Sequence, residues 1–388
     1  MPSILSGQIA NAERPFEMLA IGDSVVWGQG LQHDHKFSTL VAKWIENEKL
    51  TNGRKVSLYY GNAHSGASVT FRDDITPHPP YSGEVNVYNP SILEQVNSSL
   101  IYYKTRKTVE GGPLTPDKVD LILVDGGIND MGAMSIVNLF YRKIDLNAAA
   151  ETHCRKKMAE QLLPKIASTY PNARIVVTGY FPLISRLSDV HRFWEMLLHL
   201  FPADQLLNVL DSVGIARLST KFAFMPLSLL KLALSTKSGK AILANAPAYA
   251  SGVVGAFRNQ LADRSDLWYQ TSNQSLRIAV NQANSSLPIT GAIQFSQTNP
   301  RVIFASPTFL SANCFASPQP FLWELDGLKT NDELYSNRQT DCKVLTGQRG
   351  NLITCHRAGL FHPNVAGASA YFDSIKQNLQ VIWPQTDW

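Results

Sequence analysis

The sequence predicts an α/β protein built around a central, mostly parallel five-stranded sheet. Five short runs are apolar and rich in β-branched residues, as are strands that are buried on both faces of a sheet. These runs cover residues 16–21, 55–60, 119–124, 174–178 and 301–305. Segments with a helical spacing of apolar residues alternate with them, and this alternation is typical of a three-layer α/β/α sandwich. In such a fold the functional site lies at the carboxyl ends of the strands.

The helical segments are read from the spacing of their apolar residues. Between the first two strand-like runs, the apolar residues of 37–45 fall on one face of a helix. The same spacing recurs in 158–166, just before the fourth run. A further helix is expected from about residue 368, after a His-Pro pair.

Four segments place chemically useful groups after strand-like runs or before a helix. A Gly-Asp-Ser turn (22–24) ends the first run, which makes the Ser24 hydroxyl a candidate nucleophile. Gly66 lies beyond the second run, where its N–H could donate to a developing oxyanion, and the Asn129 amide after the third run is a second candidate donor. His362 precedes a proline and a helix start, which fixes its backbone as a general base requires. Taken singly, each segment also fits an ordinary turn, loop or structural residue.

Taken in order, the four segments resemble the conserved blocks of the SGNH, or GDSL-type, serine hydrolase family. The matching residues are Gly22-Asp23-Ser24, Gly66, Gly127-Ile128-Asn129-Asp130 and His362-Pro363. The resemblance implies a flavodoxin-like strand order, Ser24 as nucleophile and His362 as general base. It also implies an oxyanion hole made by the Ser24 and Gly66 N–H groups and the Asn129 amide.

The chain departs from that family three residues before His362. The family usually carries an aspartate there, which orients the imidazole and stabilises its charged form, whereas this chain has Gly359. Three alternatives follow: a backbone carbonyl near Gly359 orients the ring, or Asp341 or Asp326 takes the place of the missing carboxylate, or the enzyme is impaired. We favour the backbone carbonyl, and hence a Ser-His dyad.

The resemblance implies a carboxylic-ester hydrolase, an esterase or lipase that works through an acyl-enzyme. Its expected partner is a small-molecule or lipid ester. Two alternatives stay open: a carbohydrate O-acetylesterase of the same fold, and a noncatalytic binding protein that keeps the fold without the reaction.

The four segments must converge, so we expect residues 1–388 to form one catalytic domain with a long insertion at 185–300. Within the insertion, 193–201 and 222–234 are strongly apolar, but neither reaches the length that spans a bilayer. One interpretation is a helical subdomain with its own small core. The other is a lid or apolar wall over an acyl pocket, with transient contact to a lipid surface.

Composition excludes several other classes of function. A net charge of +4 on 388 residues, without a dense Lys/Arg block, argues against nucleic acid as a partner. Neither a phosphate-binding loop nor a dinucleotide fingerprint occurs, so no cofactor is expected. The triplet His33-Asp34-His35 lacks the spacing of a metal site, so no metal is expected either.

The four cysteines bear on the compartment. Cys342 and Cys355 could form a disulfide that braces the loop before His362 in an oxidising compartment, and separate reduced thiols are the alternative. No signal peptide is visible at the start of the chain. We therefore expect a cytoplasmic protein if the chain is unprocessed, and a secreted or periplasmic one if it is a mature form.

Overall fold

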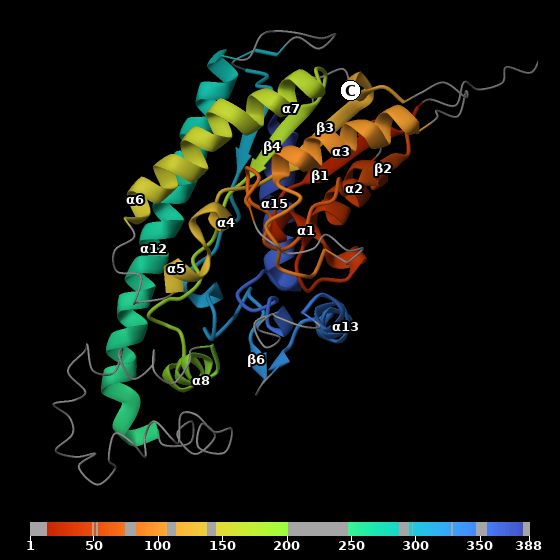
Figure 1. Ribbon diagram of the computed structural model, residues 1–388. Helices are drawn as coiled ribbons and strands as arrows, with labels where there is room; N and C mark the ends of the chain where they lie inside the picture. Colours follow the sequence, from red (N-terminus) through yellow and green to blue (C-terminus); the bar gives the residue numbers. More distant parts are fainter. Residues whose placement is uncertain are drawn as a thin grey trace, which may run out of the picture.

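Five parallel strands form the centre of the structure, in the order β2-β1-β3-β4-β5 (Figure 1). They are β1 (Phe16–Ile21), β2 (Val56–Tyr59), β3 (Val119–Val124), β4 (Arg174–Thr178) and β5 (Val302–Ala305). All five lie within the predicted runs, which confirms the α/β class and the central parallel sheet. The chain steps from β1 outward to β2 and then back across to β3, so the strand order reverses between β1 and β3. In open α/β sheets, ligands bind at such a reversal.

The structure is a computed structural model. It describes residues 14–48, 50–51, 53–73, 83–106, 114–137, 145–200, 247–286, 295–296, 298–326, 329–346 and 355–382.

Burial along the strands follows their place in the sheet. β1, β3 and β4 are buried along their whole length, because each has a neighbour on both sides and helices above and below. The edge strand β2 is only half-buried. The other edge strand, β5, is fully buried because the helix α12 (Pro247–Ser286) packs against it.

Helices cover both faces of the sheet, which confirms the three-layer arrangement (Figure 1). On one face, α2 (Phe37–Asn47) packs against α15 (Val365–Ile382), and the rings of Phe37 and Tyr371 stack with centroids 5.0 Å apart. On the other face, α3 (Ile92–Thr105) packs against α7 (Leu163–Thr169). The helix predicted at 158–166 thus occurs, although its first part is the π-helix η5 (Met158–Leu162).

Shorter elements lie in the connections. The helices are α1 (Ser24–Trp27), η1 (His33–His35), η2 (Pro116–Lys118), α4 (Ile128–Met131), α5 (Met134–Val137), α6 (Leu146–Ala149), η4 (Ala150–Lys156) and η7 (Ser311–Asn313). Late in the chain, β6 (Leu325–Asp326) and β7 (Lys329–Thr330) form a small antiparallel pair, followed by α13 (Tyr335–Thr346).

The long insertion contributes two described helices, α8 (Val190–Leu200) and α12. At about 1.5 Å per residue, the 40 residues of α12 extend roughly 60 Å, and the helix runs along one side of the molecule (Figure 1). Its buried side chains, among them Phe257 and Trp268, belong to the same apolar core as the sheet. The apolar segment 222–234 lies outside the described residues, so the lid interpretation stays a prediction. Within the described part of the chain, no helix is both long and apolar enough to cross a membrane.

Of the two alternatives left open for Cys342 and Cys355, the structure has the disulfide. It joins α13 to the segment that leads into His362. The other two cysteines, Cys154 and Cys314, are buried free thiols.

Shortening a buried side chain in a central strand should destabilise the fold. Leu123 lies in the middle strand β3 and is completely buried, so Leu123→Ala should lower the free energy of unfolding by about 2–5 kcal/mol. Leu187 is 54% exposed, so the control variant Leu187→Ala should change the free energy of unfolding by no more than about 0.5 kcal/mol. Urea unfolding of both variants measures the difference. Equal losses would contradict the burial assigned to β3.

Candidate active site

The candidate residues meet at the reversal of strand order. A cavity of about 170 Å³ is lined by Ser24 after β1, Gly66 after β2, Asn129 after β3, and His362 before α15. Ser24, Gly66 and Asn129 meet because parallel strands bring their carboxyl ends to one edge of the sheet, and His362, much later in the chain, joins them from the segment before α15.

A tight turn presents Ser24 at the end of β1. Gly22 must be glycine, because a Cβ at this position would lie 2.0 Å from Oδ1 of Asp125, the residue that follows β3. The Asp125 carboxyl group accepts hydrogen bonds from the backbone N–H groups of Asp23 (2.7 Å) and Val26 (3.1 Å). These contacts fix the backbone on both sides of Ser24.

Two buried carboxyl groups lie beneath this turn. The Asp23 side chain accepts from the Val25 N–H (2.9 Å) and from the Tyr180 hydroxyl (3.2 Å), and neither Asp23 nor Asp125 is exposed. Burial and the neighbouring Asp23 charge raise the pKa of Asp125 well above its ordinary value, which favours the protonated form of this carboxyl group. Sequence analysis did not single out Asp125, although it follows a strand-like run directly and precedes two glycines.

Gly66 and Asn129 lie on two loops that are tied together. The Asn129 amide donates to the Ala67 carbonyl (3.1 Å), which leaves its second N–H for another acceptor. Next to these, Asp130 accepts from the Val69 N–H (2.8 Å) and from Lys157 (2.6 Å). These hydrogen bonds fix the position of the Asn129 loop relative to the Gly66 loop.

The backbone at Gly66 has a φ of +86°, and a Cβ there would lie 2.0 Å from Oδ1 of Asn86. Both observations require glycine. Within the described residues, the N–H groups of Ser24 and Gly66 have no acceptor. They and the Asn129 amide belong to residues that line the same cavity, as the donors of an oxyanion hole must.

His362 contacts the Ser24 hydroxyl directly. Nε2 of His362 lies 2.7 Å from Oγ of Ser24, although 338 positions separate the two residues. The His362 carbonyl accepts from the Trp323 N–H (2.8 Å), and its N–H donates to the Gly359 carbonyl (3.1 Å). Phe361, one residue earlier, has a φ of +65°, a conformation that is strained for a side chain of this size. The surrounding contacts must hold this backbone in place.

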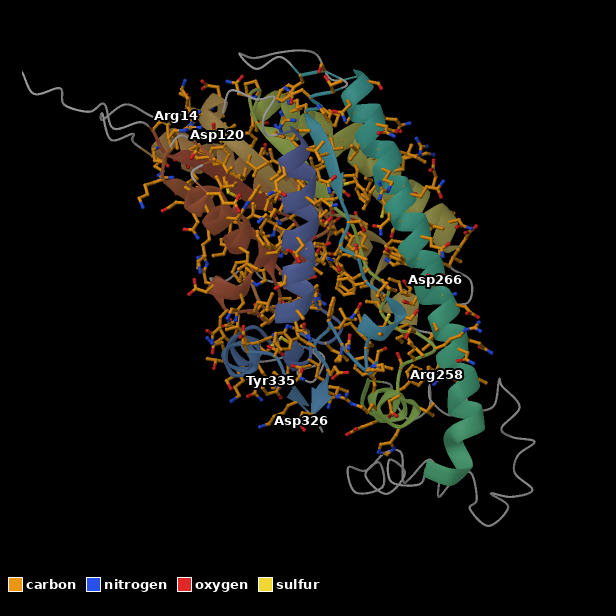
Figure 2. The ribbon with its side chains drawn as sticks, turned by 180° about the vertical axis from the view of Figure 1, so that it is seen from behind. Arg14, Asp120, Arg258, Asp266, Asp326 and Tyr335 are labelled. Carbon is orange, nitrogen blue, oxygen red and sulfur yellow. A yellow bond between two sulfur atoms is a disulfide. The ribbon has the colours of Figure 1, made fainter. Side chains whose placement is uncertain are left out.

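The other ring nitrogen faces a backbone carbonyl. Nδ1 of His362 lies 3.2 Å from the carbonyl oxygen of Leu360, next to Gly359, as the dyad interpretation expects. Neither of the two candidate aspartates hydrogen-bonds to the ring. Asp326 is exposed on β6 at the end of the molecule (Figure 2), and Asp341 lies on α13.

Burial of the His362 ring makes it a weak base in the resting protein. Desolvation, and then the nearby Arg338 charge, lower the pKa of His362 to about 4. The backbone hydrogen bonds at Gly359 and Leu360 and the charge of Asp332 act in the opposite direction. The ring is therefore neutral at pH 7 and able to accept a proton from Ser24.

The rest of the cavity is mostly apolar. Its apolar lining consists of Val25, Ile128, Ala133, Val137, Phe181, Leu183, Ala358, Leu360 and Phe361. Arg357 is the one Lys or Arg side chain among the described residues that line it. The arrangement suits a ligand with a small apolar part held against the Ser24 hydroxyl.

Two residues of the His33-Asp34-His35 triplet make contacts with other charged side chains. Asp34 pairs with Lys43 (3.1 Å), and His35 lies 2.7 Å from Glu333. In the described ranges, no group of three or more His, Cys, Asp or Glu side chains is arranged to hold a metal ion.

Comparisons with known proteins give distant structural likenesses. The chain is similar to the crystal structure of an extracellular lipase from Streptomyces rimosus, with 12% identity, a TM-score of 0.38, and 94% of this chain and 99% of that chain covered. It is similar to a phospholipase A1 from Streptomyces albidoflavus NA297 at 12% identity, a TM-score of 0.39 and the same coverage. No family model and no curated protein sequence matches the chain.

The lowered pKa of His362 should make stability depend on pH. Between the unfolded pKa of about 6.5 and the folded pKa of about 4, only the unfolded chain binds the proton. The stability that comes from keeping the ring neutral is therefore complete above pH 6.5 and decreases as the pH falls. On going from pH 7 to 4.5, wild type should lose on the order of 2 kcal/mol more than His362→Gln. Urea unfolding at both pH values measures this, and equal losses in the two proteins would contradict the assigned burial.

Proposed function

We propose that this protein hydrolyses carboxylic esters through a covalent acyl-enzyme, with Ser24 as nucleophile and His362 as general base. The observation that carries the proposal is the 2.7 Å contact between Oγ of Ser24 and Nε2 of His362. Its position in a cavity that Gly66 and Asn129 also line supports the proposal further, because an activated serine needs oxyanion donors to catalyse acyl transfer.

The reaction follows from these positions. Oγ of Ser24 attacks the ester carbonyl carbon while Nε2 of His362 takes the hydroxyl proton. The carbonyl oxygen becomes an oxyanion, which accepts hydrogen bonds from the Ser24 and Gly66 N–H groups and the Asn129 amide. His362 then gives its proton to the departing alcohol as the bond between carbonyl carbon and alcohol oxygen breaks. Water repeats the sequence on the acyl-enzyme, releasing the carboxylic acid and restoring Ser24.

The lining of the cavity supports an apolar acyl group. Side chains such as Phe181, Leu183 and Phe361 surround Ser24, and burying an acyl chain among them gains about 0.8 kcal/mol per methylene. A lipid-like or other acyl ester therefore fits the site better than an acetyl group on a polar carbohydrate.

The disulfide supports an oxidising compartment for this activity. Structural disulfides persist in secreted and periplasmic proteins and are rare in the cytosol. Cys342–Cys355 joins α13 to the segment that carries the proposed base, so we propose that the enzyme works outside the cytosol.

Loss of an oxyanion donor should slow turnover without unfolding the protein. Asn129→Ala should lower kcat for p-nitrophenyl esters by about 100- to 1,000-fold, because the lost amide stabilises charge that develops only in the transition state. KM should change little. Asn378→Ala is the matched control, since Asn378 lies on α15 and is not among the residues that line the cavity. Wild-type turnover in Asn129→Ala would contradict the proposed oxyanion hole.

A series of p-nitrophenyl esters of increasing chain length distinguishes the substrates in the same assay. A maximum beyond acetate is the expected result. A maximum at acetate would favour the carbohydrate O-acetylesterase, and absence of turnover on every ester would favour a binding protein.

A further inference from the structure

Gly359 has no room for a side chain. Its backbone is not in the left-handed region, so its conformation does not require glycine. A Cβ at this position would lie 2.5 Å from Oδ2 of Asp332 and 2.9 Å from Nη2 of Arg338, distances that real Cβ atoms do not show. The Asp332 carboxylate therefore fills the space beside Gly359, whose carbonyl accepts the His362 N–H.

The Asp332 carboxylate is fixed in this space. Its side chain is completely buried and accepts hydrogen bonds from the Thr330 hydroxyl, from the Leu334 N–H (3.2 Å) and from Nη2 of Arg338 (2.5 Å). An ion pair this deeply buried is expensive to desolvate and is a weak source of stability. Its presence beside the candidate base therefore calls for an explanation other than stability.

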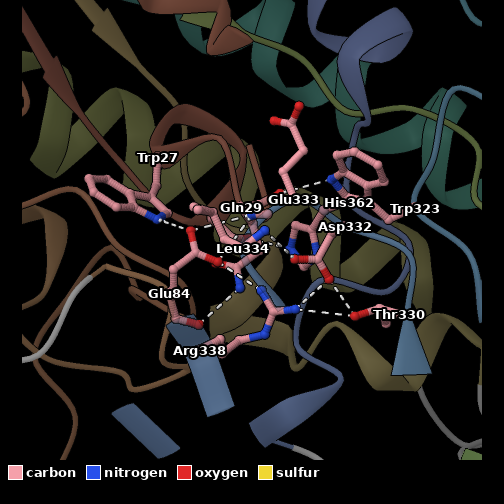
Figure 3. Close-up of polar contacts among 12 residues, drawn as sticks. Trp27, Gln29, Glu84, Trp323, Thr330, Asp332, Glu333, Leu334, Arg338 and His362 are labelled. Carbon is pink, nitrogen blue, oxygen red and sulfur yellow. Dashed lines mark hydrogen bonds and ion pairs between the residues drawn. The ribbon is translucent and has the colours of Figure 1, made fainter. Parts of the chain in front are cut away.

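Arg338 links the Asp332 carboxylate to a second carboxylate, that of Glu84. Its guanidinium also donates to Glu84 (2.8 Å) and to the His356 carbonyl (3.1 Å), and it is completely buried (Figure 3). Glu84 in turn accepts from Nε1 of Trp27 (2.8 Å). Contacts from Glu84, from His356 and from the stretch 330–334 thus hold this charge pair in a defined position near His362.

The two charges act on His362 with opposite sign. Arg338 lowers the pKa of the His362 ring, and Asp332 raises it by a smaller amount, so the Asp332 carboxylate offsets part of the effect of the Arg338 charge. In a serine hydrolase the ring becomes an imidazolium in the transition state, and a fixed carboxylate nearby stabilises that cation. The Leu360 carbonyl orients the ring but carries no full charge.

We infer that Asp332 is a positioning residue for His362: it supplies, from the β7–α13 segment, the negative charge that a Ser-His-Asp triad places beside its histidine, and Arg338 fixes it there. This inference rests on the proposed esterase function. Asp332 does not line the cavity, so it acts on the base and not on the substrate.

The first test is Asp332→Asn, which removes the charge and keeps the size of the side chain. We expect kcat for a p-nitrophenyl ester to fall by at least about tenfold, since tenfold corresponds to one pKa unit of lost stabilisation of the imidazolium. KM should stay within about twofold, and the acid limb of kcat/KM should move to lower pH. Asp326→Asn, which changes an exposed aspartate of the neighbouring β6, should leave kcat unchanged.

The second test moves the carboxylate. Gly359→Asp alone should be inactive, because its side chain collides with Asp332, and Asp332→Gly alone should be slow. The double variant Asp332→Gly/Gly359→Asp places a carboxylate in the vacated space, and its kcat should exceed that of Asp332→Gly by at least about tenfold. A purely structural role predicts no such rescue, and urea midpoints of all variants control for folding.

The inference is overturned if folded Asp332→Asn has wild-type kcat and pH profile, or if Asp332→Asn unfolds and the double variant is no faster than Asp332→Gly. These results leave the proposed function intact, because wild type still turns over and Ser24→Ala does not. An inactive wild type would instead overturn the proposed function, and this inference with it.

Discussion

The hydrogen bond between Ser24 and His362 depends on the entire sheet. Ser24 follows the first strand and His362 precedes the last described helix, so their atoms meet at 2.7 Å only when β1 and α15 are packed in their native places. Phe37 of α2 and Tyr371 of α15 stack on each other, and this contact helps to hold α15 in place. The proposed catalytic pair therefore forms only in the folded chain.

The carboxyl ends of β1 and β3 are joined by a buried side chain. The Asp125 carboxyl group accepts hydrogen bonds from two backbone N–H groups of the turn around Ser24. Gly22, which has no side chain, leaves the space that this carboxyl group occupies. Burial raises the pKa of Asp125, and this is the cost of placing an ionisable group beneath the turn. The position of the nucleophile is thus set by β3 as much as by β1.

Much of this arrangement could be predicted because it depends on local pattern. Mostly apolar runs identified β1 and β3, and a glycine-containing turn after a strand pointed to Ser24. The pairing of Cys342 with Cys355 was one of two alternatives, and the sequence alone did not decide between them.

Contacts between distant segments could not be predicted. Asp332 and Arg338 belong to no recognisable sequence motif, and only the folded chain brings them close to His362. Asp341 and Asp326, the candidates from the same part of the chain, make no hydrogen bond to the His362 ring. The 40-residue helix α12 was not predicted in detail, because its sequence is polar overall and its apolar residues become buried only when it packs against distant elements such as η4, α8 and β5.

The central claim is that Ser24 is a nucleophile activated by His362, and covalent labelling tests it most directly. The protein is treated with a fluorophosphonate, and the adduct is located by peptide mass spectrometry. The account predicts one adduct per chain, on Ser24, which is absent in Ser24→Ala and forms far more slowly in His362→Gln. Wild-type protein that remains unlabelled, or is labelled on a different residue, would contradict it.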